Sequence, residues 1–305
     1  MLGLMESRPF QSPISFTAVA HAAPPHVWFG VSALFHYLGP SFAMLLFPSI
    51  GVLGVAWIRI ASAALIFAPW TKAWRTIRAV SPRSRYLLIG LGVCLAAMNT
   101  SFYLALDRLP MSLVAAMEFV GTIGVALYGL RTARNLAALA LAVLGACLLI
   151  DVKWSSDPLG LFWSFLNGAL FVVYIVLGHK ISQAGASSGI VQLGAAMAIA
   201  ALFVLPIGFL QAVKAFASAE LIIAGIGVGV CSSVIPYVCD QLAMSRLSRA
   251  SFALMLALLP ATATVIGIIV LAQVPNAQDV AGVLLVMLGV ASHKPATPAA
   301  DEARD

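Results

Sequence analysis

The sequence predicts an all-α integral membrane protein with ten transmembrane helices, arranged as two inverted five-helix repeats. Of its 305 residues, 62% are hydrophobic and only 9% are charged, whereas soluble domains carry about 25% charged residues. Backbone polar groups in lipid must pair internally, so the spans are helices or the strands of a closed barrel. Barrel strands alternate in hydrophobicity, but runs such as Leu136–Ile150 are apolar on every side. The sequence therefore predicts helices.

The spans follow a polar, proline-containing segment at 1–26, which we interpret as a cytosolic tail. A cleaved signal peptide is the alternative, although no uninterrupted apolar region precedes the small-residue run AVAHAA. Ten apolar segments then approach or reach membrane-spanning length: Val27–Phe47, Ser49–Ala68, Tyr86–Leu106, Ser112–Leu130, Leu136–Ile150, Leu159–Leu177, Ile190–Leu210, Leu221–Met244, Ala250–Leu271 and Ala277–Ala291. The first repeat is predicted at 27–150, the second at 159–291 and a cytosolic C-terminal tail at 292–305.

The charges of the connections predict the orientation. Lys and Arg concentrate on the cytosolic side of membrane proteins. Three of them lie in the connections of one side: Arg108, Lys153 and Lys214. Ten lie on the other: Lys72, Arg75, Arg78, Arg83, Arg85, Arg131, Arg134, Lys180, Arg246 and Arg249. With ten spans, both termini share the basic side, which we expect to be the cytosol. This pattern explains the net charge of +6 better than a nucleic-acid partner does.

A stretch of the first half recurs in the second. Shifted by 138 positions, Ala105–Leu127 aligns with a later segment and Arg108 meets Arg246. Five spans separate the two arginines, an odd number, so the two halves are predicted to be inverted. A second match, Leu141–Gly145 with Leu285–Gly289, has an offset of 144. Chance similarity of apolar helices is the alternative; inverted repeats would place a substrate near the midplane at their interface.

Two charged residues lie deep within predicted spans, Arg59 in the second and Glu118 in the fourth. A charge at the centre of a span costs about 2.5–3.5 kcal/mol and usually marks a transport pathway. Both helices run the same way and the two charges lie at comparable depth, so a salt bridge between them would remove much of this cost. Arg59 would hold a substrate carboxylate, and Glu118 an amine or a proton. A structural pair that locks two helices is the alternative.

Further polar residues complete the predicted site. Asp240, near the end of the eighth span, is a candidate inner gate or proton site, or else a helix-end carboxylate. The remaining candidate substrate contacts are Asn99, Phe119, Ser232 and Ser233. Polar side chains of this kind also join helices to one another. Pro236 and Pro260 each free a backbone carbonyl and are candidate hinges, or plain kinks.

Other chemistries lack their signatures. The sequence has no P-loop, GxGxxG or HExxH motif, and Cys94, Cys147, Cys231 and Cys239 show no metal-ligand spacing. We therefore expect no cofactor, no metal and no enzymatic activity. A membrane enzyme acting on lipid would need clustered His, Asp or Cys residues near one membrane face, which the sequence lacks.

These features resemble the drug/metabolite transporter superfamily, in particular its EamA-type branch of ten-helix exporters. Within that branch, ALDRLPMSLVAAMEFVG (Ala105–Gly121), Arg59 in its second-span context and IPYVCDQLAMSRLSRASFALMLALLPA (Ile235–Ala261) are similar to the threonine/homoserine exporter group. The resemblance extends over about residues 27–291. Thr122 stands where that group tends to have proline, and Ala272-Gln273 where the superfamily often has Gly-Glu.

The resemblance implies a secondary transporter that exports small polar metabolites, amino acids like threonine or homoserine, from a bacterial inner membrane. Inverted repeats would work by alternating access. A drive from the proton gradient, or simple exchange, would need only one titratable site, and a homodimer is a candidate assembly. The partners would then be a small-molecule substrate and the lipid bilayer. Other cargo of the superfamily, such as drugs or nucleotide sugars, is the nearest alternative. A non-transporting scaffold or sensor is a further one, although the short loops leave little surface for docking.

Overall fold

The structure is a computed structural model that describes residues 22–115, 117–119, 122, 132–149, 157–183, 186–272 and 277–292. Within these ranges the chain is helical, with turns between helices and no strand. Seven helical segments of the described chain are long and apolar enough to cross a membrane. Two shorter apolar helices, at Ala133–Gly145 and Val280–Gly289, coincide with the predicted fifth and tenth spans. Of the predicted tails at 1–26 and 292–305, residues 1–21 and 293–305 lie outside the described residues, while Pro25, His26 and Ser292 belong to helices.

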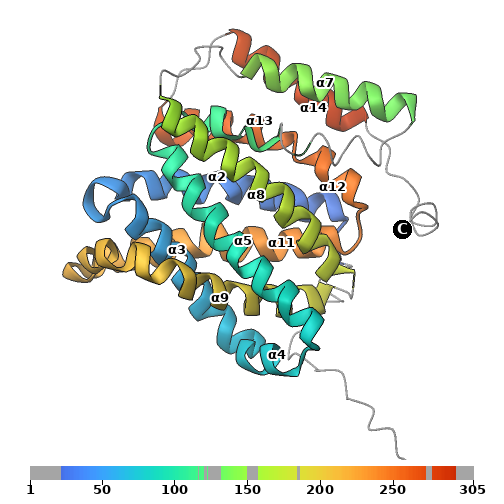
Figure 1. Cartoon of the computed structure of the whole chain (residues 1–305). Coiled ribbons are helices and arrows are strands. Elements are labelled where there is room, and N and C mark those ends of the chain that lie inside the picture. The colour runs from blue at the N-terminus through green and yellow to red at the C-terminus, as the bar shows by residue number, and fades with distance from the viewer. Residues whose placement is uncertain are drawn as a thin grey trace, which may run out of the picture.

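The helices of the first half are shown from blue to green in Figure 1. Their bounds are α2 Pro25–Ile50, α3 Val52–Thr71, α4 Ala73–Ala79, α5 Pro82–Leu106 and, after the fourth predicted span, α7 Ala133–Leu149. Proline opens α2 and α5, where its missing N–H costs nothing. Gly51 ends α2 with φ 91°, a left-handed conformation that glycine adopts readily. Of the predicted fourth span, Ser112–Ala115, Met117–Phe119 and Thr122 are described, and all are helical.

The second half contains α8 Pro158–Ser182, α9 Ala186–Ala212, η1 Val213–Ala217, α10 Ala219–Gly229, η2 Val230–Val234, α11 Ile235–Met244, α12 Arg249–Met255, α13 Leu258–Leu271 and α14 Ala277–Ser292.

The predicted eighth and ninth spans are both interrupted. A π-helical turn, η2, separates α10 from α11 just before Pro236. A turn at Leu256–Ala257 separates α12 from α13 shortly before Pro260. Each proline lacks the N–H that would close the helix at its fourth predecessor, so the helix gives way there.

Helices of the first half pack mainly against helices of the second. The main contacts join α3 to α9, α7 to α14, α5 to α8 and α9, and α2 to α11 and α13. In Figure 1, α7 and α14 lie side by side at one edge of the bundle. Large apolar side chains such as Leu65, Leu210 and Ile269, each exposed by 70% or more, face outward. An apolar outer surface of this kind suits lipid.

The α7–α14 contact is reciprocal at the glycines of the second sequence match. A Cβ on Gly145 would lie 2.7 Å from the carbonyl oxygen of Gly282 and from Val286. A Cβ on Gly289 would lie 2.7 Å from the carbonyl oxygen of Ala138 and 2.8 Å from the backbone nitrogen of Ala142. Ascending positions in α7 therefore meet descending positions in α14, so the two helices are antiparallel. The small-residue positions let the backbones approach closely.

The turns that follow α5 and α11 share one backbone hydrogen-bond pattern, 138 positions apart. Arg108 N–H and Leu109 N–H both donate to the carbonyl of Ala105. Arg246 N–H and Leu247 N–H donate in the same way to the carbonyl of Ala243. The sequence match around the two arginines therefore corresponds to the same local structure in both halves.

Candidate functional site

Arg59 is buried in the middle of the bundle, with 2% of its surface exposed. Its Nε donates to Ser233 Oγ at 2.9 Å, and its Nη2 donates to the carbonyl oxygen of Ser232 at 2.6 Å. The guanidinium carbon also lies 5.2 Å from the centroid of the Tyr103 ring and 5.9 Å from that of Phe102. These cation–π contacts partly replace the water that the charge has lost.

The Ser232 carbonyl is available because of Pro236. In a regular helix that carbonyl would accept from the N–H of the residue four positions later, and proline has none. The π-helical turn η2, which is one residue wider than an α-helical turn, contains both Ser232 and Ser233. Such turns are frequent at functional sites. Pro236 thus leaves the Ser232 carbonyl without a helix partner, and Arg59 donates to that carbonyl instead.

Glu118 is equally buried, with 2% exposed, and binds two neutral side chains. Tyr37 OH, from α2, donates to its Oε2 at 2.7 Å. Asn167 Nδ2, from α8, donates to its Oε1 at 2.7 Å. A carboxylate with one donor on each oxygen is satisfied without a cation.

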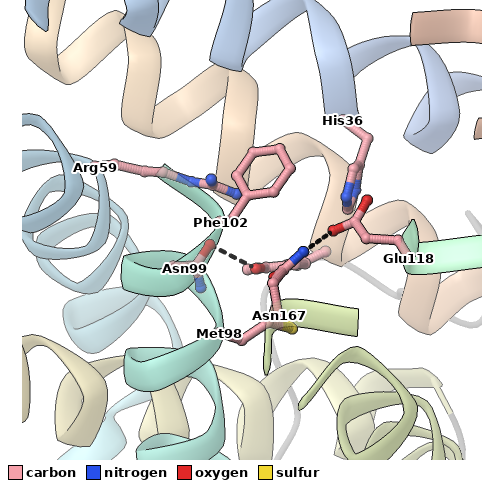
Figure 2. A pocket seen from close by; sticks show the side chains of 8 residues that line it. His36, Arg59, Met98, Asn99, Phe102, Glu118 and Asn167 are labelled. Carbon is pink, nitrogen blue, oxygen red and sulfur yellow. Dashed lines mark hydrogen bonds between the residues drawn. The ribbon is translucent and has the colours of Figure 1, made fainter. Parts of the chain in front are cut away.

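Arg59 and Glu118 do not form the salt bridge that the sequence suggested. Within the described chain, the ion pair that forms is between Arg108 and Asp157. Arg59 instead uses the carbonyl that Pro236 leaves free, and Glu118 uses Tyr37 and Asn167. The two charges therefore lie at separate places around one cavity (Figure 2).

The cavity is polar at both ends and narrow in this conformation. Its volume is ≈ 10 Å³, about the least that holds one water molecule. An amino acid does not fit until the cavity widens. The lining side chains come from α2, α3, α5, the fourth span, α8 and α11: His36, Arg59, Met98, Asn99, Phe102, Glu118, Asn167 and Tyr237.

Several buried polar atoms around this cavity make no hydrogen bond of good geometry within the described residues. They include Arg59 Nη1, Tyr103 OH, Ser232 Oγ and Asn167 Oδ1. Tyr103 OH lies beside both Arg59 and Ser232. A buried polar group without a partner costs about 1–3 kcal/mol, so native proteins keep such groups where a ligand or water completes them. Three of these four atoms lie at Arg59, and one, Asn167 Oδ1, lies beside Glu118.

The other predicted residues divide between the cavity and its surroundings. Asn99 lines the cavity and accepts from Tyr237 OH at 3.2 Å, while Ser232 and Ser233 position Arg59. Phe119 points elsewhere, into an apolar cluster with residues of α7 and α12. Asp240 lies outside the cavity lining and binds Ser32 and Tyr174.

Sequence reasoning missed His36, Tyr37, Asn167 and Tyr237. Aromatic residues and a lone amide in apolar spans look like ordinary helix-packing residues. One signal was present: Asn99 and Tyr237, which hydrogen-bond to each other, are separated by 138 positions, the offset of the first sequence match.

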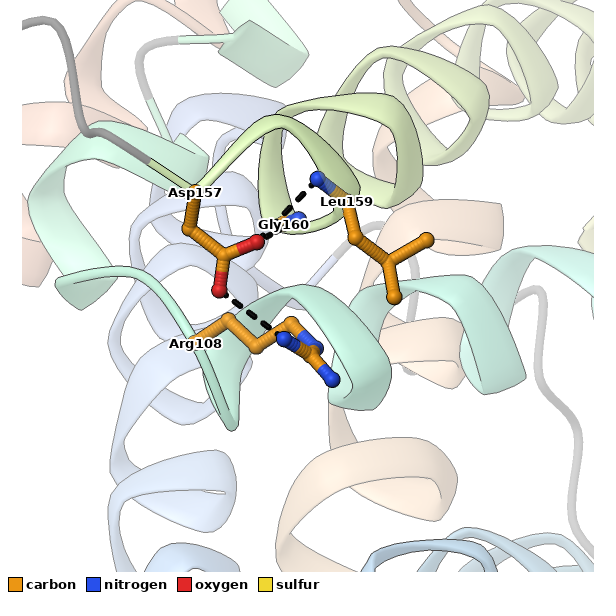
Figure 3. A network of polar contacts seen from close by, with 4 residues as sticks. All are labelled: Arg108, Asp157, Leu159 and Gly160. Atoms are coloured by element: carbon orange, nitrogen blue, oxygen red, sulfur yellow. Dashed lines mark hydrogen bonds and ion pairs between the residues drawn. The ribbon is translucent and has the colours of Figure 1, made fainter.

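A second polar network joins the end of α5 to the start of α8 (Figure 3). Arg108 Nη1 lies 2.9 Å from Asp157 Oδ2, while Asp157 Oδ1 accepts from the N–H groups of Leu159 and Gly160. The N–H of Gly160, together with Arg108, holds the pKa of Asp157 below its ordinary value. Asp157 is thus the N-cap of α8 and also an ion-pair partner.

An equivalent contact joins the end of α11 to the start of α2. Arg246 Nη1 donates to the carbonyl oxygen of Ala23 at 2.8 Å. Ala23 precedes Pro24, the N-cap of α2. Arg108 and Arg246, matched in sequence, therefore each contact the residues that precede the first long helix of the other half.

Comparisons with known proteins agree with this architecture. Residues 158–292 match the EamA-like transporter family. The threonine/homoserine exporter RhtA of Escherichia coli (strain K12) is 34% identical over 238 residues, which are 77% of this chain and 79% of the exporter. The exporter of the same name from Salmonella typhimurium (strain LT2) is 34% identical over the same shares. A solved crystal structure superposes on 92% of this chain and 99% of its own with a TM-score of 0.59. Its identity is 16%, so this likeness shows the fold alone.

Proposed function

This chain belongs to the EamA-like transporter family, and from that membership we propose that it exports a small amino acid, threonine or homoserine or one of similar shape, from a bacterial cytosol. The relatives at 34% identity are named as exporters of these two amino acids. The observation that carries the proposal is the arrangement of two opposite buried charges around one cavity, with the unsatisfied Arg59 Nη1 at one charge and the unsatisfied Asn167 Oδ1 beside the other.

The Arg59 end of the cavity suits a carboxylate. Two of the three guanidinium nitrogens already donate to Ser233 and Ser232, and these bonds fix the plane of the group. The third, Nη1, makes no hydrogen bond of good geometry in the described chain, and the hydroxyl groups of Tyr103 and Ser232 lie within reach of each other and of Arg59. A carboxylate placed there would accept from Arg59 and from up to two hydroxyl groups. Charge-assisted hydrogen bonds of this kind are about twice as strong as neutral ones.

The Glu118 end suits an ammonium group. Tyr37 and Asn167 hold the two carboxylate oxygens, and Asn167 Oδ1 is left without a partner in the described chain. An ammonium offers three donors and no acceptor, so it matches an arrangement of acceptor oxygens. A zwitterion would neutralise both buried charges at once, which lowers the cost of keeping them in the membrane.

A cavity of ≈ 10 Å³ is too small for an amino acid, so transport requires it to widen, and we propose that it does so by alternating access. We expect it to widen toward one side and then the other as the two five-helix halves move against each other. Three observations support an inverted relation of the halves: the reciprocal Gly145 and Gly289 contacts in an antiparallel helix pair, the shared turn structure 138 positions apart, and the paired contacts of Arg108 and Arg246.

We assign the contacts of Arg108 and Arg246 to the two gates of the transport path. With both termini in the cytosol, as the loop charges predict, Arg108 and Asp157 close the outer end. Arg246 and Ala23 then close the inner end. Both contacts are formed here, in keeping with a cavity too small for substrate. Export would break the inner contact to load substrate and the outer one to release it.

Proton coupling is assigned to Glu118, because an acid with neutral partners can exchange its proton when substrate leaves. The test is efflux from bacterial cells that overexpress the wild type, Glu118→Gln or the exposed control Glu220→Gln. Each strain is challenged with toxic concentrations of threonine, homoserine, other amino acids and amino-acid analogues. Resistance and external accumulation for a narrow set, lost in Glu118→Gln and kept in Glu220→Gln, would support the proposal. Efflux of no amino acid by a correctly inserted wild type would overturn it.

A further inference from the structure

A second carboxyl group is buried between the same helices as Glu118. Asp240, on α11, has 4% of its surface exposed. Its Oδ1 accepts from Ser32 Oγ at 2.5 Å, and its Oδ2 accepts from Tyr174 OH at 3.0 Å. Ser32 belongs to α2 and Tyr174 to α8, the two helices that also supply Tyr37 and Asn167 to Glu118.

The positions of their hydrogen-bond partners along α2 and α8 show how far apart Asp240 and Glu118 lie along the bundle. Ser32 precedes Tyr37 by five residues, which is about 7.5 Å along α2 at about 1.5 Å per residue. Tyr174 follows Asn167 by seven residues, which is about 10.5 Å along α8. On both helices the partners of Asp240 lie closer to the start of α2 than the partners of Glu118 do. The start of α2 is the end predicted to face the cytosol.

The partners of Asp240 suit a group that gains and loses a proton. A hydroxyl both donates and accepts, so Ser32 and Tyr174 can donate to the carboxylate and can also accept from the carboxylic acid. An arginine or lysine partner would fix the charged form, but no ion pair to Asp240 forms within the described ranges. The polar partners therefore allow both protonation states in a buried place, where a permanent charge is costly.

Two packed tyrosine rings lie between Asp240 and the central cavity. Tyr174 packs against Tyr237 with ring centroids 5.5 Å apart, and Tyr237 lines the cavity. The titratable groups that face Asp240 are Tyr174 from α8 and Tyr237 and Cys239 from its own helix, with Cys94 of α5 beyond Tyr174. Helix α2 contributes the hydroxyl of Ser32.

We propose that Asp240 is a second proton-binding site of the transport cycle, between the substrate cavity and the cytosolic face. A proton that arrives through the cavity binds the Asp240 carboxylate, forming an O–H bond, and leaves to cytosolic water when the inner end opens. Net export then moves protons inward through two acids in series. This inference rests on the proposed function and adds a residue that does not touch the substrate.

The test separates proton coupling from substrate movement in liposomes that contain the purified full-length protein. Exchange of radiolabelled threonine at equal pH needs no net proton transfer, whereas accumulation driven by a pH difference does. In Asp240→Asn, exchange should stay within about twofold of the wild type and accumulation should fall at least about tenfold, because an amide takes up no proton at these pH values. Asp240→Glu should restore part of the accumulation.

The other outcomes decide against the inference. Unchanged accumulation in Asp240→Asn, or an equal loss of exchange and accumulation, would make Asp240 a structural residue. Wild-type exchange without any response to a pH difference would also overturn it, while leaving amino-acid transport intact. Absence of wild-type exchange for threonine and every other amino acid would instead refute the proposed function.

A second pair of variants keeps the test decisive if Asp240→Asn does not insert. Ser32→Ala and Tyr174→Phe each remove one donor and leave the carboxyl group. The charged form then loses stabilisation, so the pH of half-maximal accumulation should rise. Tyr86→Phe is the matched control, because Tyr86 is 76% exposed. No shift in either variant relative to this control would overturn the proposal.

Discussion

The guanidinium of Arg59 donates from Nη2 to the backbone carbonyl of Ser232, 2.6 Å away. A buried cation is thereby held by the main chain of a π-helical turn rather than by a carboxylate. The carboxylate of Glu118 remains free to serve a ligand or a proton. This division of roles explains how two opposite charges persist at one cavity without neutralising each other.

Replacement of Pro236 by alanine should weaken substrate binding without unfolding the protein. The alanine would supply an N–H that competes with Arg59 for the Ser232 carbonyl. A hydrogen bond to a charged group contributes about 1.5–3 kcal/mol, so we expect KM for efflux to rise about tenfold. The thermal midpoint should stay the same or increase, since proline disfavours the helix interior. Pro206→Ala, in the exposed part of α9, is the control; equal KM values for both variants would contradict the assigned role of Pro236.

Replacement of Gly39 by alanine should destabilise the protein. A Cβ at Gly39 would collide with Ser232 Oγ and lie 2.6 Å from the Ser232 backbone nitrogen, so α2 and η2 would have to separate. Overpacking of this kind costs about 1–3 kcal/mol. Gly30→Ala is the matched control on the same helix, because a Cβ there meets nothing within 4 Å. Thermal unfolding in detergent measures both; a midpoint for Gly39→Ala as high as that of Gly30→Ala would refute the close approach.

Stability should depend on pH through Asp157. Its pKa is lowered in the folded protein by the N–H of Gly160 and by Arg108. The contribution is fully present above the ordinary aspartate pKa of about 3.9, and it is lost as pH falls through the lower folded value. The thermal midpoint of Asp157→Asn should therefore lie below that of the wild type at about pH 6, and the two should converge in strong acid. A difference that grows on acidification would contradict this.

Removal of Arg108 and removal of Arg246 should shift the equilibrium between the outward-open and inward-open states in opposite directions. Arg108→Ala should favour the state open to the outside, and Arg246→Ala the state open to the cytosol. Both contacts are exposed, and exposed contacts of this kind are weak, so we expect each population to change by no more than about fivefold. Apparent threonine affinity, measured in intact cells and in inverted vesicles, should change in opposite directions for the two variants. Arg75→Ala, on the exposed side of α4, should change neither; changes in the same direction for both variants would exclude paired gates.

The helical membrane-spanning class could be predicted from the sequence, because apolar runs of span length are strong signals. Arg59 and Glu118 could be found because a charge within such a run is rare. Their partners could not: Tyr37 and Asn167 look like packing residues until the helices are assembled. Arg59 and Glu118 do not form a salt bridge, because Arg59 binds the carbonyl that Pro236 leaves free on a neighbouring helix. The sequence shows that a carbonyl is freed, but only the packing of α3 against η2 shows what it binds.

We propose that Arg59 holds the carboxylate of the substrate and Glu118 its ammonium group. Ligand-dependent thermal stability tests it most directly, because a ligand that binds only the folded state stabilises it by about 2.7 kcal/mol at a concentration of about 100 Kd. The wild type and Glu220→Gln should be stabilised by threonine, but far less by threonine methyl ester, which lacks the carboxylate, or by N-acetylthreonine, which lacks the amine. Arg59→Gln and Glu118→Gln should lose the response to threonine. Equal stabilisation by threonine and both derivatives, or an undiminished response in Glu118→Gln, would contradict the account.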